Sequence, residues 1–244
     1  MQTPFSAVFE NAPSLGAAFS AGAAVYGIRY FLLAGIFFAL ARSGLGRPLH
    51  AEPGRRDLLR EIGYSLGTIA LFGAVAAVLY SSGIIRHSQV YFRVESPAWF
   101  WLSIPVMLFV HDTLFYWLHR LMHHPALFRR VHLVHHLSVK PSAWAAYSFH
   151  PREALLEELL VVLIVFTIPS HPAALMIFQS LSTLINVYGH CGREFYPEGW
   201  HRHWMGKWIN TSTLHDRHHH SGRGNYGLYL LFWDRLMGTV NETP

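Results

Sequence analysis

The feature that most constrains this chain is a set of long apolar segments without charged residues. Residues 62–85 contain no Asp, Glu, Lys or Arg, and residues 97–118 are nearly as apolar, although His111 and Asp112 interrupt them. A helix that crosses a lipid bilayer needs about 20 mostly apolar residues. Inside a bilayer only helices and closed barrels satisfy every backbone hydrogen bond. The two segments therefore predict membrane-spanning helices.

Two further segments complete the predicted membrane part. Residues 159–189 also lack charged side chains, and Pro169-Ser-His-Pro172 breaks them into two short arms, which predicts a helical hairpin. Another apolar segment predicts a helix over about residues 22–42. We therefore expect an all-α, multi-pass membrane bundle with about four spans plus short helices. Residues 1–96 would hold the N-terminal spans, and residues 97–244 would combine membrane helices with a histidine-rich cap.

The composition favours a membrane protein over a nucleic-acid-binding one. Hydrophobic residues make up 52% of the chain and charged residues only 14%, whereas globular proteins average about 25% charged residues. The net charge is +5, but no basic run is long enough for a nucleic-acid patch. The single cysteine, Cys191, excludes an internal disulfide. The N-terminus lacks a positively charged region, so we expect no cleaved signal peptide.

The basic residues predict how the chain is oriented in the membrane. Short loops on the cytoplasmic side carry an excess of Lys and Arg. Five basic residues lie within residues 42–61 and five within 119–152, whereas residues 86–96 contain two. We therefore place 42–61 and 119–152 on the cytoplasmic side, to which the hairpin would also return residues 190–244. The histidine-rich cap would then face the cytoplasm.

Histidines are concentrated beside these predicted helices. Fifteen of the 18 histidines fall within residues 111–150 and 190–220. Six of them form two His-X-X-His-His motifs, and residues three and four apart share a helical face, so each motif can direct imidazoles at one point. Neutral imidazole is the commonest protein metal ligand. The motifs predict a site for more than one metal ion, with ligands His132, His135, His136, His215, His218 and His219.

Three more histidines extend the predicted site. His119 and His123 lie four residues apart on one helical face, and His190 ends the apolar hairpin at the depth expected for a ligand. Asp112 shares the face of His119, so we predict that it accepts an imidazole N–H and supports catalysis. The competing interpretation is a solvated polar turn or a belt of side chains at the membrane surface. Residues expected next to the ligands are His111, His150 and Asp216, of which His150 is equally a candidate ligand.

The sequence constrains the metal less closely. The chain has no His-Glu-X-X-His motif, which disfavours a zinc protease. Nine imidazoles suffice for two ions and leave positions for oxygen or water, and non-haem iron carries out oxygen chemistry in buried pockets. Spacing alone excludes neither zinc nor copper. Glu153, Glu157 and Glu158 cluster where an apolar helix begins, which is typical of a solvated turn.

The order and spacing of these motifs resemble the fatty acid hydroxylase and sterol desaturase superfamily of integral-membrane di-iron oxygenases. The resemblance implies the nine histidines named above as ligands, two non-haem iron ions, and O2 as co-substrate. Some members carry another histidine four residues before His190, where this chain has Asn186. The matching motifs are His111-Asp-Thr-Leu-Phe-Tyr-Trp-Leu-His-Arg-Leu-Met-His-His124, Phe128-Arg-Arg-Val-His-Leu-Val-His-His136, Ala146-Tyr-Ser-Phe-His-Pro151, Gly189-His-Cys-Gly192, Leu214-His-Asp-Arg-His-His219, Gly224-Asn-Tyr-Gly-Leu-Tyr229 and Phe232-Trp-Asp-Arg-Leu-Met-Gly-Thr239.

The resemblance also implies a function. It predicts an oxidoreductase that hydroxylates or desaturates a C–H bond of a membrane lipid, such as a sterol or a fatty acyl chain. Electrons would come from a separate ferredoxin-like or cytochrome b5-like protein, because the sequence has no flavin fingerprint. Zinc can replace iron at imidazole sites. The alternative is a membrane protein that binds or transports zinc without redox chemistry, and the lipid substrate stays open.

Overall fold

The computed structural model describes residues 14–242, which are mostly helical. The helices α2 (Leu15–Arg42), α3 (Arg55–Ser81) and α4 (Pro97–Met122) are long and apolar enough to cross a membrane. They confirm the three long helices predicted from the apolar segments, although the ends differ. Ser14 caps α2, which therefore begins before residue 22, and Gly83 turns the chain with a φ of 73° soon after α3 ends.

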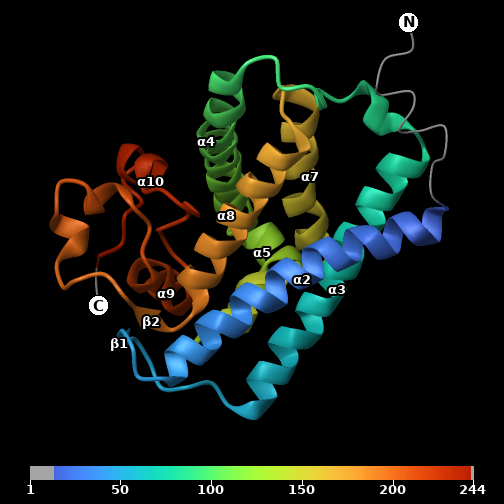
Figure 1. Cartoon of the computed structure of the whole chain (residues 1–244). Helices are drawn as coiled ribbons and strands as arrows, with labels where there is room; N and C mark the ends of the chain where they lie inside the picture. Colours follow the sequence, from blue (N-terminus) through green and yellow to red (C-terminus); the bar gives the residue numbers. More distant parts are fainter. Residues whose placement is uncertain (1–13, 243–244) are drawn as a thin grey trace, which may run out of the picture.

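The predicted hairpin is formed by α7 (Pro151–Thr167) and α8 (Pro172–His190). These helices contain 17 and 19 residues, so both are shorter than the three long helices. They stand beside α4 in Figure 1, and the buried side chains of Met107, Ile164 and Phe178 pack between the three helices. The count of about four membrane spans stays a prediction, because it depends on whether this shorter hairpin crosses the bilayer.

Helices α2 and α3 cross at a contact made of small residues. A Cβ atom on Gly73 would lie 2.9 Å from the Cβ atom of Ala23, so no larger side chain fits there. Small residues that let backbones approach closely are characteristic of helix packing in membranes. Nearer the cap, the ring of Tyr30 stacks on that of Tyr147 with centroids 4.8 Å apart, and this contact joins the α2–α3 pair to the rest of the protein.

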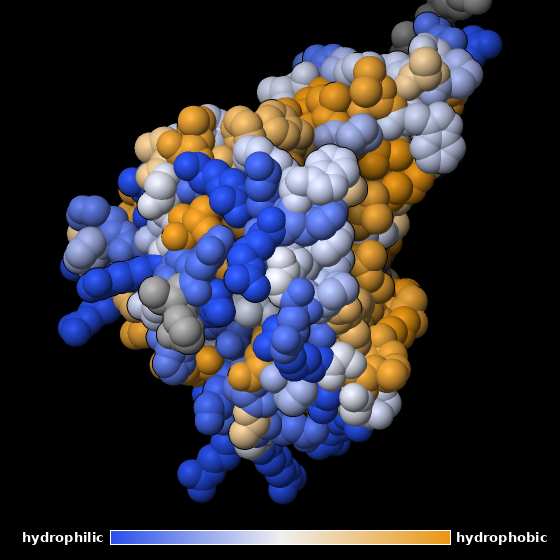
Figure 2. Space-filling model, turned by 90° about the vertical axis from the view of Figure 1, so that its left-hand side faces the viewer, coloured by the Kyte–Doolittle hydropathy of each residue, from blue (hydrophilic) through white to orange (hydrophobic). Residues whose placement is uncertain are grey.

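Most of the remaining chain forms a cap at one end of the long helices (Figure 1). The strands β1 (Arg47–Pro48) and β2 (Arg193–Glu194) pair antiparallel there. Figure 2 shows hydrophilic residues over the cap and hydrophobic residues along the long helices that extend from it. The other short elements are η1 (Ile84–His87), α5 (Pro125–Val131), α6 (Leu133–His136), η2 (Ala143–Tyr147), η3 (Trp200–Arg202), η4 (Gly206–Trp208), α9 (Ser212–Ser221) and α10 (Phe232–Leu236).

Candidate metal centre

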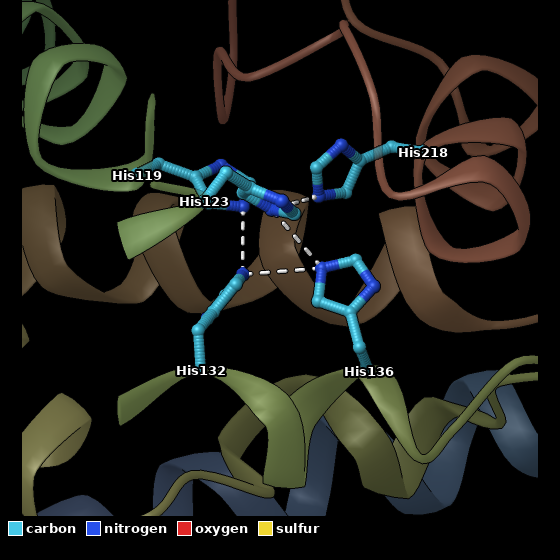
Figure 3. Close-up of side chains that lie close together, drawn as sticks. All are labelled: His119, His123, His132, His136 and His218. Carbon is cyan, nitrogen blue, oxygen red and sulfur yellow. Dashed lines mark hydrogen bonds between the residues drawn. The ribbon is translucent and has the colours of Figure 1, made fainter. Parts of the chain in front are cut away.

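All nine histidines predicted as ligands lie together, in two adjacent clusters. The ring centroids of His136 and His219, one from each cluster, are 4.9 Å apart. The first cluster, drawn in Figure 3, has ligand atoms from α4, α6, α9 and the turns that follow α4 and α5: His119, His123, His132, His136 and His218. The second cluster has ligand atoms from α6, α8 and α9: His135, His190, His215 and His219.

Each His-X-X-His-His motif contributes to both clusters. His132 and His136 belong to the first cluster, whereas His135 belongs to the second. The other motif is split in the same way, and its middle histidine, His218, is the one that differs. At about 100° per residue, the outer histidines of a motif differ by roughly 40°, while the middle one points about 60° to the other side. The chain at α6 and α9 therefore lies between the clusters and supplies ligand atoms to both.

Ring nitrogens face one another at the centre of the first cluster. Nε2 of His132 lies 3.0 Å from Nε2 of His119 and 3.1 Å from Nε2 of His136. Nε2 of His123 lies 3.2 Å from the Nε2 atoms of His136 and His218. Nitrogen ligands about 2.1 Å from a shared ion lie roughly 3.0–3.4 Å apart. The spacing in this cluster is therefore that of a metal coordination sphere.

The Nδ1 atoms of His119 and His218 show that the facing Nε2 atoms of these two rings are unprotonated. Nδ1 of His119 lies 2.8 Å from the carbonyl oxygen of Tyr226, and a carbonyl only accepts, so this Nδ1 carries the proton. Nδ1 of His218 donates to the carbonyl of Gly224 at 2.7 Å in the same way. Nε2 of His119 and Nε2 of His218 then each present a lone pair to the cluster centre. Lone pairs repel one another without a cation between them, so this donor set fits a metal ion.

His190 lies at the centre of the second cluster. Its Nε2 atom is 3.2 Å from that of His135, 3.0 Å from that of His215 and 3.1 Å from that of His219. Its Nδ1 atom donates to the carbonyl of Asn186 at 2.7 Å, which leaves Nε2 with a lone pair. The Nδ1 atoms of His135 and His219 are buried and have no hydrogen-bond partner in residues 14–242.

Burial keeps the imidazoles of both clusters neutral. Desolvation lowers the pKa of His123 to about 3 and that of His218 to about 4, from an ordinary value of 6.5. It also lowers the pKa values of His132 and His219 well below that value. A neutral imidazole has a free lone pair, so at neutral pH these residues are in the form that binds a metal ion.

Glu153 is a site residue that the sequence interpretation misses. The expected solvated turn is wrong, because Glu153, Glu157 and Glu158 are all buried. Oε1 of Glu153 lies 2.6 Å from Nδ1 of His132. A carboxylate in this position fixes the orientation of the ring and makes it a more basic ligand. The signal available in the sequence was the four-residue spacing of Glu153 and Glu157, which places them on one face of a helix whose second half is apolar.

The prediction that Asp112 accepts an imidazole N–H is wrong. Its Oδ1 atom accepts hydrogen bonds from the backbone N–H groups of Leu228 at 3.0 Å and Tyr229 at 2.7 Å. Those amides belong to a returning segment of the cap that is buried against α4 and needs an acceptor. Asp112 therefore positions this segment, and it belongs to neither histidine cluster.

The three residues expected next to the ligands also lie outside both clusters. Nδ1 of His111 is 3.0 Å from the hydroxyl of Tyr229. Oδ1 of Asp216 is 3.3 Å from Nε2 of His50, so its partner is a histidine outside the clusters. His150 is a helix cap, because its Nδ1 accepts the N–H of Arg152 at 3.2 Å.

The capping role of His150 follows a pattern that the sequence shows three times. Helices α5, α7 and α8 each begin with a His-Pro pair, and the histidine Nδ1 accepts the N–H of the residue after the proline. Proline is favoured at the first position of a helix because its ring is already set to the helical φ. His124, His150 and His171 are therefore caps, which explains why they contribute nothing to the metal clusters.

Comparison with known proteins places this architecture in a family. The sequence profile described as "Fatty acid hydroxylase" matches residues 104–239. Because this match covers more than half of the chain, the chain belongs to the fatty acid hydroxylase family. The matched range contains all nine histidines of the two clusters, from His119 to His219. Together with the three candidate spans, this identifies a multi-pass membrane protein with a histidine-rich site.

Several curated relatives are sterol desaturases or sterol oxidases by name. A Delta(7)-sterol 5(6)-desaturase of Aspergillus fumigatus is 30% identical over 77% of this chain and 55% of its own length. One from Gibberella zeae is 27% identical over 76% of this chain and 56% of its own length. The lathosterol oxidase of Mus musculus is 28% identical over 79% of this chain and 64% of its own length. The chain thus spans little more than half the length of these relatives, and no solved structure matches it.

Proposed function

We propose that this protein is an O2-dependent oxidoreductase that uses two non-haem iron ions to hydroxylate or desaturate a C–H bond of a membrane lipid. The observation that carries the proposal is the pair of adjacent clusters, in which nine imidazoles face two centres. The relatives act on sterols by name, which favours a sterol-like lipid as the substrate class. The comparisons give no support to the alternative of a zinc-binding or zinc-transporting protein without redox chemistry.

Bound iron would supply the oxidising power that an unactivated C–H bond requires. The residues of the chain hold the two sites in place. Glu153 orients His132, and the carbonyls of Tyr226 and Gly224 orient His119 and His218. Eight of the nine ligand histidines are buried, so bulk water is kept away from the reacting centre.

A cavity of about 420 Å³ provides room for the apolar body of a lipid. It lies between α4, α8 and the cap, and its lining includes Leu108, Ile185 and Leu230. Binding sites for small molecules are typically about 300–1,000 Å³ and mostly apolar. Because α4 and α8 also carry His119 and His190, a lipid in this cavity would lie along the helices that reach both clusters.

The activity can be tested by metal analysis combined with lipid analysis. Protein produced without added zinc should contain about two iron ions per chain, and cells that produce it should accumulate a hydroxylated or desaturated lipid. Zinc can replace iron during overexpression, so zinc-loaded protein is first stripped and reconstituted with iron. A stably folded protein that binds no metal, or an iron-loaded and reduced protein that leaves every membrane lipid unchanged, would overturn the proposal.

We further propose that the cap faces the cytoplasm and receives electrons from a separate ferredoxin-like or cytochrome b5-like protein. The distribution of basic residues supports this orientation. It is tested on a Cys191→Ser background with one new cysteine at an exposed position on each side. An impermeant thiol reagent added to intact cells should label Arg93→Cys and spare Lys140→Cys, and the reverse pattern would show the opposite orientation.

A further inference from the structure

A polar cavity of about 240 Å³ lies in the cap, beside the β1–β2 pair and α9 (Figure 1). Three arginines from separate segments line it: Arg47 of β1, Arg202 of η3 and Arg217 of α9. At about 100° per residue, Arg217 lies roughly 160° around α9 from His215 and from His219, so its side chain leaves the helix on the side opposite these two ligands. The metal centre and the lipid cavity described above use none of these arginines.

The hydrogen-bond donors around this cavity lack acceptors within the protein. Among residues 14–242, none of the three guanidinium groups has a hydrogen-bond partner or a salt bridge. Nη1 of Arg217 and Nε1 of Trp200 are buried atoms, yet no acceptor among the described residues reaches either of them. The ring of Trp200 is stacked between those of Tyr196 and His203, with centroids 5.0 Å apart on each side. Buried donors that are held in place without an acceptor are destabilising, so they indicate a bound acceptor.

Two carboxylates also line the cavity, but they do not satisfy these donors. Both oxygens of Glu194 are already occupied. Its Oε1 atom accepts the hydroxyl of Tyr188 and the N–H of Tyr196, and its Oε2 atom accepts the N–H of Thr213 at 3.0 Å and its hydroxyl at 2.7 Å. The side chain of Glu198 is exposed, so solvent screens its charge. Because three arginines face two carboxylates, the cavity keeps a net positive charge.

The unpartnered donors define the chemistry of a ligand. A guanidinium group presents paired N–H donors that match the oxygens of a phosphate or a carboxylate. A phosphoryl group has three free oxygens in a tetrahedral arrangement, so it can accept from Arg217, Trp200 and Arg202 at once, whereas a carboxylate has two oxygens in one plane. The cavity is larger than a phosphoryl group alone and has room for part of the molecule that carries it. We propose that this cavity binds the phosphoryl group of a phosphate ester, which comes either from a soluble molecule or from the headgroup of an anionic lipid.

The test measures binding to the metal-loaded full chain in nanodiscs of phosphatidylcholine by calorimetry at constant ionic strength. The probes are inorganic phosphate, glycerol 3-phosphate and succinate, which is a dicarboxylate of similar charge. We expect both phosphates to bind saturably and more tightly than succinate. Absence of saturable binding, or tighter binding of succinate, would overturn the proposal.

A second arm of the test separates the two sources of the phosphoryl group. Nanodiscs that also contain phosphatidic acid present a phosphate monoester at the membrane surface. If the headgroup reaches the cavity, glycerol 3-phosphate should bind more weakly to these nanodiscs, which supports a lipid as the source. If its affinity is unchanged, the cavity takes its phosphate ester from solution.

Variants of the arginines identify the cavity as the binding site. Arg217→Leu removes a buried donor and should weaken phosphate binding about 10- to 100-fold, as expected for hydrogen bonds between charged groups. Arg202→Leu should weaken it as well, and its exposed side chain makes this variant safe for folding if Arg217→Leu is unstable. The control is Arg223→Leu, which removes the same charge from an exposed arginine outside the cavity and should keep the parent affinity. Binding that survives both cavity variants would place the phosphate at the metal ions, and equal losses in all three variants would show unspecific attraction; either result would overturn the proposal.

Discussion

The two histidine clusters share α6 and α9, but they are held differently. In the first cluster, Nδ1 atoms of His119, His132 and His218 contact Tyr226, Glu153 and Gly224 respectively, so three of five imidazoles are oriented from behind. In the second cluster, Nδ1 of His190 has such a partner, whereas those of His135 and His219 have none among the described residues. The second cluster also has one ligand fewer.

This difference in hydrogen bonding indicates that the two neighbouring metal sites differ in affinity and in role. Partners behind the ligands are known to affect metal affinity about 10- to 100-fold when removed. We therefore expect the first cluster to hold its ion more tightly. The second cluster has four ligands, so we expect it to leave a coordination position for an exogenous oxygen ligand. Phe149, whose ring centroid lies 5.2 Å from that of His135 in this cluster, also lines a cavity of about 50 Å³ between α2, α7 and α8.

The largest effect should come from removing one ligand from each cluster. His136→Ala and His219→Ala should each lower turnover by more than about 100-fold, because loss of a ligand exceeds the loss of a residue that only supports one. Each variant should retain about one of the two ions by elemental analysis. The matched control is His220→Ala, next to His219 but exposed, which should stay within a few-fold of the parent. Equal damage in all three would mean that these histidines serve folding in general.

A smaller effect should follow from removing the carboxylate behind His132. Glu153→Gln removes the negative charge and should weaken metal binding at the first cluster about 10- to 100-fold, with the second cluster unchanged. The measurement is metal release to a chelator at increasing concentration, since the two ions should then leave in two steps. The exposed Glu52→Gln serves as control. If Glu153→Gln weakens both ions equally, the clusters are not held independently.

Asp112 should matter for the cap and not for either cluster. Asp112→Ala leaves the backbone N–H groups of Leu228 and Tyr229 without their acceptor, and each buried unpaired group costs about 1–3 kcal/mol. Asp112→Asn keeps an oxygen acceptor and should be much milder. The thermal unfolding temperature of the metal-loaded protein should therefore fall clearly in Asp112→Ala and slightly in Asp112→Asn. Both variants should still bind two metal ions. A selective loss of one ion would restore a direct role for Asp112 at a ligand.

The rate at which the Cys191 thiol is alkylated should show whether the second cluster is intact. Burial raises the pKa of this thiol to about 11, so it is nearly all protonated at pH 8 and should react slowly with a maleimide. Because it follows His190 directly, loosening of the second cluster should expose it. We expect faster alkylation in His219→Ala and an unchanged rate in His136→Ala. Equal acceleration in both variants would show that the clusters open together.

The sequence was sufficient for the elements that depend on local patterns. The apolar segments predict α2, α3 and α4. The two His-X-X-His-His motifs, the pair His119 and His123, and His190 together predict the nine histidines that the structure brings close to one another. Helical angles explain how the three histidines of each motif are divided between the two clusters, but they could be used only after the structure had shown that there are two clusters. The partner of Asp112 could not be predicted, because Leu228 lies more than 100 residues away. Glu153 was missed because a carboxylate at the start of a helix is usually solvated, and here the burial comes from packing against distant elements.

The chain order of the ligands has a consequence for biosynthesis. Helix α9 leaves the ribosome after every other helix that supplies a ligand, and it carries His215, His218 and His219. Neither centre is complete before it arrives, whereas α2, α3 and α4 have by then entered the membrane. The β1–β2 pairing likewise waits for residues 193–194 to meet a loop made about 145 residues earlier. Metal binding at either centre would thus be possible only after α9 has been made, and a nascent chain stalled before α9 should be inserted in the membrane but unable to retain a metal ion.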